Sequence, residues 1–269
     1  QFKPPTLPQR IYTKTLNVDN VHYADFCQEV DWPASEHVHP VYMQMLSLPL
    51  QMQCLLDKKS PFPLLGLIHA GNQIVVLEDC DLSEPFECRV RFHDVRPHSR
   101  GWEVDVMLEG LQSGSLVYRA ISSYLVKVKA VHVAPRGSKS DSNEECNLED
   151  RTLIAEINAS ANTGRRYAKL SGDYNPIHLS AISAKAFGFK QPIAHGMWTL
   201  SRVVSAFVSH QGDAQSITVK EVNCRFKKPV FLPNVIHVQQ HCKTDNSSLL
   251  DVTDSDDNLV HLSASVSFK

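Results

Sequence analysis

The sequence predicts a mixed α+β protein built from two similar units in one chain of 269 residues. A polar stretch at residues 134–150, APRGSKSDSNEECNLED, contains Gly and Pro and almost no apolar residues, which is typical of a linker. On each side of it, helical patterns come early and a set of apolar, alternating runs follows. The shared order indicates two diverged copies, at residues 1–133 and 151–269.

The first half is expected to begin with helices and to continue with strands. Residues 21–30 have the pattern of a short helix, and residues 41–56 that of a longer apolar helix interrupted by Pro49. In the later runs, the alternation of Val104, Val106 and Leu108 with polar residues marks strands with one buried face. The expected strands are 67–77, 86–92, 102–108 and 116–128.

The second half repeats this order around one long helix at residues 196–210. A strand at 153–157 and a short helix at 165–170 precede it. The expected strands that follow are 217–226, 235–242, 249–252 and 259–268. The long helix has one broad apolar face, made by Leu200, Val203, Val204, Phe207 and Val208. Such a helix packs best across the concave face of an antiparallel sheet, because both elements must bury their apolar sides.

The composition is that of an ordinary globular protein with no general affinity for polyanions. Hydrophobic residues make up 42% of the chain, and 27 basic and 29 acidic residues give a formal charge of -2. This balance disfavours nucleic acid and anionic membranes as partners, so any polyanionic ligand must be held by a local basic patch. His37 and His39 could hold a metal, but no acid and cysteine grouping completes a site, so no metal is expected.

Several features of the chain point to a soluble, cytoplasmic protein. No apolar stretch approaches the roughly 18 residues of a membrane span, and residues 1–10 lack the apolar core of a signal peptide. The seven cysteines include no C-x-x-C pair and are odd in number, which argues for reduced thiols.

The candidate chemistry lies between Tyr167 and Trp198, in the stretch YAKLSGDYNPIHLSAISAKAFGFKQPIAHGMW. This stretch contains Asp173, Asn175 and His178 in the order D-x-N-P-x-H, followed by IAHGM. It closely resembles the hydratase motif of the MaoC-like dehydratases and of the hydratase part of peroxisomal multifunctional enzyme type 2. The match covers more than thirty positions in order. The rest of the second half fits the strand pattern of that family, whereas the first half fits it only loosely.

Asp173 and His178 are of the residue types that share a proton in acid–base catalysis. On a regular helix their separation would place the two side chains about 140° apart, but Gly172 and Pro176 disfavour a regular helix. A turn followed by a short helix that ends at Gly188 brings both side chains to one point. There, a carboxylate and an imidazole can activate a water molecule and return its proton to a substrate. Asn175 can orient that water or a neighbouring side chain.

Gly196 stands at the start of the long helix, where free N–H groups and the positive end of the helix dipole can stabilise an oxygen that becomes negatively charged. The absence of a side chain there permits a close approach. The neighbours expected to contact the substrate are Ile193, Ala194, His195 and Met197. Among them, His195 is more typical of a packed helix entry than of a second base.

The resemblance implies a double hot-dog fold, in which two antiparallel sheets each wrap around a long helix. It also implies reversible addition of water to a trans-2-enoyl thioester, which gives an (R)-3-hydroxyacyl thioester without a cofactor. The thioester would be carried on coenzyme A or on acyl carrier protein. The first half contains no D-x-N-P-x-H, so it is expected to be a degenerate unit and the chain to have one active site. A homodimer is compatible with this arrangement.

Two other functions stay open at this point. Hot-dog proteins also include acyl-thioester hydrolases, because a fold does not determine a reaction. A non-catalytic subunit that binds acyl thioesters is the second alternative, although such a subunit would be expected to have lost Asp173 or His178. The sequence leaves open which of these two residues acts as acid and which as base.

Overall fold

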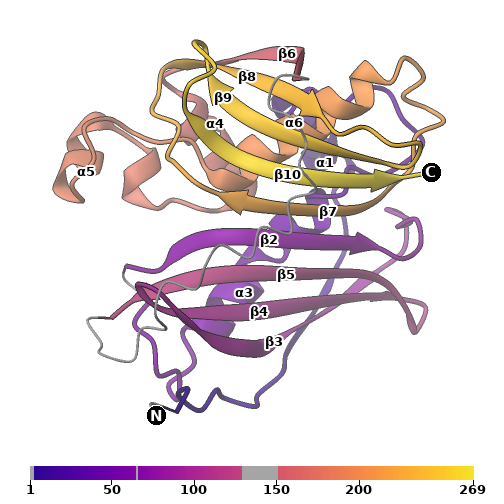
Figure 1. Ribbon diagram of the computed structural model, residues 1–269. Coiled ribbons are helices and arrows are strands. Elements are labelled where there is room, and N and C mark those ends of the chain that lie inside the picture. Colours follow the sequence, from indigo (N-terminus) through magenta and orange to yellow (C-terminus); the bar gives the residue numbers. More distant parts are fainter. Residues whose placement is uncertain (1–2, 65, 129–150) are drawn as a thin grey trace.

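One antiparallel sheet of ten strands runs through the whole molecule (Figure 1). The computed structural model describes residues 3–64, 66–128 and 151–269. The strand order is β1-β3-β4-β5-β2-β7-β10-β9-β8-β6, and each neighbouring pair is antiparallel. The first five strands in this order come from the first half of the chain and the last five from the second. The pairing of β2 with β7 therefore joins the two halves.

The first half follows the expected order, with one added strand and one divided helix. Its strands are β1 (Tyr12–Leu16), β2 (Ile68–Val76), β3 (Phe86–His98), β4 (Gly101–Gln112) and β5 (Ser115–Lys127). Its helices are α1 (Asn20–Glu29), α2 (Tyr42–Leu46) and α3 (Leu48–Leu55). The edge strand β1 was not predicted, and β3 is longer than expected. The expected long helix is divided at Ser47, because Pro49 lies in the first turn of α3, where its missing N–H costs nothing.

The second half contains the long helix, α6 (Gly196–His210), in the predicted place. Its strands are β6 (Thr152–Ala159), β7 (Val219–Phe226), β8 (Asn234–His241), β9 (Ser247–Asp254) and β10 (Val260–Phe268). The other helices are α4 (Thr163–Ser171), the 3-10 turn η2 (Pro176–His178) and α5 (Ala181–Ala186). In Figure 1, α5 projects from the body of the molecule beside the sheet.

Each half packs its helices against one face of its part of the sheet. In the first half α3 contacts β3 and β4, and in the second half α6 contacts β6 and β10. The predicted apolar face of α6 is completely buried, as burial of both apolar sides requires. This is the arrangement of a double hot-dog fold, which confirms the predicted fold class. The face of the sheet that carries these helices is called the inner face below.

The continuous sheet agrees with two units that complete one fold in a single chain. The expected linker at residues 134–150 lies outside the described residues, so the division into units at 133 and 151 stays a prediction.

No helix within the described part of the chain is both long and apolar enough to cross a membrane. The expectation of reduced thiols holds for Cys27, Cys54, Cys80, Cys88 and Cys224. It is wrong for Cys242, which is disulfide-bonded.

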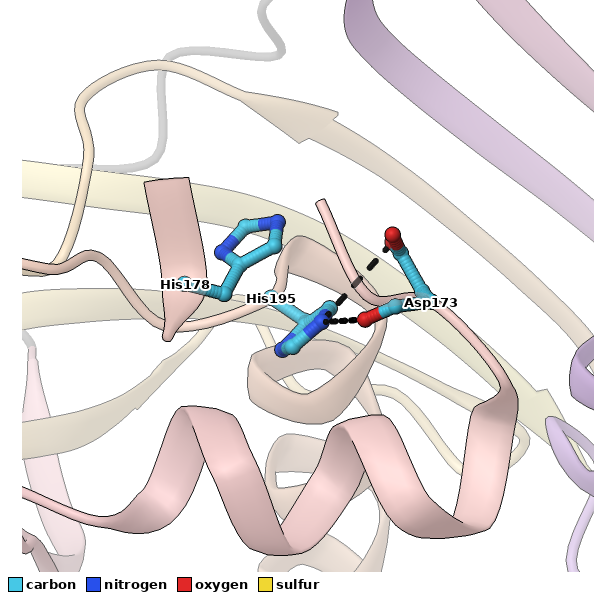
Figure 2. A group of neighbouring side chains, drawn as sticks. All are labelled: Asp173, His178 and His195. Atoms are coloured by element: carbon cyan, nitrogen blue, oxygen red, sulfur yellow. Dashed lines mark hydrogen bonds and ion pairs between the residues drawn. The ribbon is translucent and has the colours of Figure 1, made fainter. Parts of the chain in front are cut away.

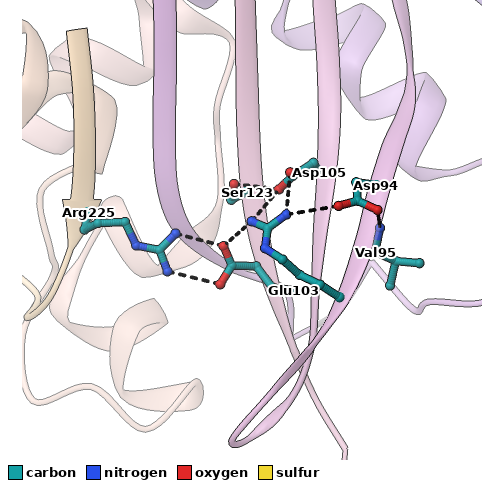
Figure 3. Close-up of polar contacts among 7 residues, drawn as sticks. Asp94, Val95, Glu103, Asp105, Ser123 and Arg225 are labelled. Carbon is teal, nitrogen blue, oxygen red and sulfur yellow. Dashed lines mark hydrogen bonds and ion pairs between the residues drawn. The ribbon is translucent and has the colours of Figure 1, made fainter. Parts of the chain in front are cut away.

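A charged cluster on the outer face ties the first half to β7 (Figure 3). The Glu103 carboxylate on β4 accepts hydrogen bonds from Arg225 on β7 at 2.8 and 3.1 Å and from Arg96 on β3 at 2.6 Å. Arg96 also donates to Asp105 at 2.6 Å, and Ser123 donates to the same carboxylate. Burial alone would raise the pKa of Glu103, but the guanidinium groups of Arg225 and Arg96 outweigh it and lower the pKa to about 2.

Replacing Glu103 with glutamine is expected to lower the free energy of unfolding by about 1–2 kcal/mol at neutral pH, since both arginine partners are partly exposed and solvent weakens these ion pairs. The folded pKa of about 2 lies below the ordinary value of 4.5. The stabilisation is therefore complete above pH 4.5 and is lost as the pH falls towards 2. Urea unfolding of wild type and Glu103→Gln across this range measures it. Glu87→Gln, which alters an exposed pair with Arg89, is the control. A Glu103→Gln effect of equal size at both ends of the range would contradict the assignment.

Candidate active site

The segment after α4 forms the turn that the sequence predicts. Helix α4 ends at Gly172, whose φ of 75° is the left-handed conformation that glycine adopts most readily. The Asn175 side chain then accepts a hydrogen bond from the N–H of Ile177 at 3.3 Å. Pro176 opens the 3-10 turn that ends at His178. Asp173 and His178 thus come together across a turn, and Asn175 caps the 3-10 turn between them.

The His178 ring is held by the backbone in one protonation form. Its Nδ1 lies 2.8 Å from the carbonyl oxygen of Ile193. A carbonyl only accepts, so Nδ1 carries the hydrogen and Nε2 keeps its lone pair. His178 is buried, and burial lowers the pKa of the ring, although the Ile193 hydrogen bond and the Asp173 charge oppose this shift. The neutral ring can therefore accept a proton at Nε2.

His195 holds the backbone at Asp173 in place, as Figure 2 shows. Its Nε2 donates to the Asp173 carbonyl oxygen at 2.9 Å and lies 3.8 Å from the Asp173 carboxylate. The ring also stacks on that of His178, with 3.7 Å between the centroids and 26° between the planes. Burial lowers the pKa of His195, so the ring is neutral. Its Nδ1 is buried and has no hydrogen-bond partner among the described residues.

The other expected site residues lie around this cluster. Gly196 is the first residue of α6, and the side chain of the N-cap residue, His195, forms no capping hydrogen bond with that first turn. A Cβ at Gly196 would lie 2.8 Å from the Phe226 ring, so the glycine lets α6 approach β7 closely. Ala194 is buried and its N–H donates to Val230 at 2.8 Å. Ile193 supplies the carbonyl that orients His178, and Met197 packs at the edge of the core.

Asp173, His178 and His195 together offer three ligand atoms within 4.8 Å of one another. Their geometry suits proton transfer better than metal binding. The lone pairs of stacked imidazoles lie in nearly parallel planes, so they do not readily converge on a common ion. One nitrogen of each ring is also occupied by a backbone carbonyl.

Sequence reasoning missed two features of the site. The contact of His195 with Asp173 joins residues that are far apart in the motif, and the spacing alone gave no sign of it. His69 and Tyr124, from the first half, also lie near Asp173: burial lowers the pKa of His69 and raises that of Tyr124, and the Asp173 charge opposes the first shift and adds to the second. A histidine within a strand pattern was the available signal for His69.

The fold and this acid–base cluster define a hot-dog protein with a site of the hydratase type. A family model described as MaoC like domain matches residues 145–258. The curated 3-hydroxyacyl-thioester dehydratase X of Mycobacterium tuberculosis is 29% identical over 229 residues, which are 84% of this chain and 78% of the relative. The crystal structure of HtdX from the same organism superposes with a TM-score of 0.77 at 25% identity, and the match covers 96% of this chain and 99% of that one.

Two further relatives resemble parts of the chain. Peroxisomal multifunctional enzyme type 2 of Drosophila melanogaster is 26% identical over 211 residues, 74% of this chain and 34% of that protein. Peroxisomal enoyl-CoA hydratase 2 of Arabidopsis thaliana is 40% identical over 63 residues, 23% of this chain and 20% of that protein. This chain therefore spans only a minor part of either of these two proteins. Taken together, the comparisons identify a MaoC-like domain in the second half of the chain and confirm the resemblance that its motif indicated.

We expect the ring of His178 to titrate below the ordinary pKa of 6.5, because its burial outweighs the Asp173 charge. Asp173→Asn removes that charge and should lower the titration midpoint further. NMR titration of the ring resonances, assigned with His178→Gln, measures both. His237, whose pKa is raised by its hydrogen bond to Asp257, serves as a control and should titrate above 6.5. A rise of the His178 midpoint in Asp173→Asn would show that the two groups are not arranged as described.

Proposed function

We propose that the chain is a hydro-lyase that adds water reversibly to a trans-2-enoyl thioester and forms an (R)-3-hydroxyacyl thioester. The observation that carries the proposal is the tautomer of His178: its Nδ1 donates to Ile193, which leaves the lone pair on Nε2, and the ring lies in one cluster with the Asp173 carboxylate. The names of the relatives, a 3-hydroxyacyl-thioester dehydratase and an enoyl-CoA hydratase 2, support the same reaction class. Because the addition of water needs a proton transfer and a nucleophilic addition but no oxidant or reductant, the proposal includes no cofactor.

In the proposed mechanism, Asp173 and His178 bind one water molecule between them. His178 is neutral at rest, so no protonated imidazole is available as an acid. The proton that leaves the water is therefore the one that reaches the α-carbon, while the hydroxide adds to the β-carbon. Because the same two side chains deliver the hydroxide and the proton of the water molecule, both add to the same face of the double bond. His195 keeps Asp173 in position for this transfer through its backbone.

The first turn of α6 is proposed to bind the thioester oxygen. Addition of hydroxide at the β-carbon moves negative charge onto this oxygen. The N–H groups at Gly196 and Met197 lie at the positive end of a 15-residue helix and have no side-chain cap. Such donors stabilise developing negative charge without reorganising. Ile193 and Ala194 shape the entry to this turn through their backbone hydrogen bonds.

The carrier is proposed to be coenzyme A or acyl carrier protein, both of which are anionic. Basic side chains near the motif that are exposed, and therefore available to phosphate groups, are Arg165, Lys169, Lys185 and Lys190. Arg166 is exposed as well, but its guanidinium group already forms an ion pair with Glu29 at 2.8 Å. A homodimer and a cytoplasmic location belong to the proposal as well. The disulfide at Cys242 removes part of the thiol argument for that location, and the relatives named as peroxisomal offer an alternative.

Asp173→Asn and His178→Gln should each lower kcat for hydration by about two to four powers of ten, which is the usual contribution of a positioned acid–base group. Asp173→Asn keeps the shape of its side chain and should leave thermal unfolding nearly unchanged, whereas His178→Gln removes the ring that stacks on His195 and should retain the fold with a lower unfolding temperature. The loss of absorbance of the conjugated thioester in trans-2-butenoyl-CoA measures the rate. Asp213→Asn, in the exposed turn after α6, is the matched control and should retain full activity. Near-normal rates in either site variant would exclude this assignment.

The same assay separates hydration from the alternative reaction. A thiol reagent in the mixture detects hydrolysis of the thioester. Thiol release in place of the absorbance loss would identify a hydrolase, and binding of the thioester without either signal would identify a non-catalytic subunit. Both outcomes would contradict the proposed hydro-lyase.

A further inference from the structure

A row of aromatic rings crosses from the first half of the chain to the candidate active site on the inner face of the sheet. His69 on β2 lies opposite Tyr124 on β5, and the two rings stack with 5.0 Å between their centroids. The His69 ring also lies 4.9 Å from that of Phe226 on β7. Phe226 in turn packs against Gly196 at the start of α6. His69 is thus one ring away from the turn proposed to bind the thioester oxygen.

A β-bulge places His69 on this face. Ser122 of β5 bonds to Gln44 of α2 and therefore faces inward, so its neighbour Ser123, which bonds to Asp105, faces outward. Gly71 pairs with Ser123, and regular alternation would turn His69 outward as well. The register shifts between His69 and Gly71, so that His69 pairs with the inward-facing Tyr124. Bulges beside active sites commonly redirect a side chain in this way.

The ring of His69 is neutral and one of its nitrogen atoms lacks a protein partner. Burial lowers the pKa of His69 to about 4, although a backbone hydrogen bond at Gly71 and the charge of Asp173 oppose the shift. The Nε2 atom is buried and forms no hydrogen bond with any described residue. A buried polar atom without a partner costs roughly 1–3 kcal/mol, so it calls for an explanation. A phenylalanine would fill the same space without that cost.

We propose that His69 is a substrate-binding residue of the active site in the other half of the chain, and that its Nε2 hydrogen-bonds the water that adds to the double bond, which becomes the 3-hydroxyl group of the product. This inference rests on the proposed hydration reaction. The thioester oxygen lies on the far side of Phe226, at α6, whereas the water belongs beside Asp173. A water molecule or a hydroxyl group can both donate and accept, so it suits Nε2 in either tautomer of the neutral ring.

Three substitutions separate hydrogen bonding from packing. His69→Phe keeps the stacked ring and removes both nitrogen atoms. His69→Gln places an amide group near the position of Nε2, and His69→Asn places one near Nδ1. We expect His69→Phe to lower kcat/KM for trans-2-butenoyl-CoA about tenfold to a hundredfold, His69→Gln to restore part of the loss, and His69→Asn to restore none. His93→Phe, at an exposed position on β3, is the control and should match wild type.

A binding measurement provides a readout that a packing role would not change. In an Asp173→Asn background, which slows turnover strongly, calorimetry compares (R)-3-hydroxybutyryl-CoA with butyryl-CoA, which lacks the hydroxyl group. His69→Phe should weaken binding of the hydroxyacyl thioester about tenfold and leave that of the saturated thioester unchanged. Equal effects on both ligands, or none on either, would overturn the role of His69.

The two proposals can fail separately. If the wild-type protein does not hydrate the enoyl thioester, the proposed function fails whatever the substitutions at His69 do. If the wild type is active and His69→Phe keeps its full kcat/KM, only the role of His69 fails. If His69→Phe does not fold, the comparison of His69→Gln with His69→Asn decides, and equal activity of these two variants would overturn the role.

Discussion

The pairing of β2 with β7 is the interaction on which the remaining structure depends. It extends from the Gly71–Arg225 pair to the Val75–Glu221 pair and joins two five-stranded sheets into one. Because both strands are edges of their own units, neither half would satisfy the backbone groups of its edge alone. The pairing also places Phe226 of one half beside His69 of the other, so residues of the first half lie next to the candidate active site in the second. The ion pairs from Glu103 to Arg225 reinforce the same junction on the outer face.

Within the site, backbone carbonyls control the histidines. The Ile193 carbonyl fixes the hydrogen of His178 on Nδ1, and the Asp173 carbonyl fixes that of His195 on Nε2. Both rings are neutral because they are buried, so they can stack at 3.7 Å without charge repulsion. The roles of His178 and His195 differ because the second nitrogen of each ring has different surroundings. His178 keeps a lone pair at Nε2 beside a carboxylate that is about one-third exposed, whereas the free nitrogen of His195 is enclosed. This difference is why we propose His178 as the base and His195 as a positioning residue.

Local patterns in the sequence were sufficient for the features that depend on near neighbours. The apolar face of α6, the turn at Gly172 and the D-x-N-P-x-H motif all lie within short segments, and each is found as predicted. The edge strand β1 was missed because its pattern of exposure gives no alternating signal. The location of His69 could not be predicted, since its direction depends on a bulge in the pairing with β5, on a strand far away in the chain. Counting the cysteines likewise could not predict that Cys242 forms a disulfide.

The opposite end of the β2–β7 junction shows why only one half is expected to be catalytic. A small pocket there is lined by Val76, Val219 and two histidines that precede α2, as His195 precedes α6. His37 is bonded to Asp79 at 3.0 Å through Nδ1 and to Thr218 at 2.9 Å through Nε2. His39 uses Nε2 on the Ser201 carbonyl and accepts the N–H of Val41 at Nδ1. All four ring nitrogens are therefore occupied by protein groups. At this end the imidazoles connect the two halves and have no lone pair left for a water molecule, whereas His178 keeps one.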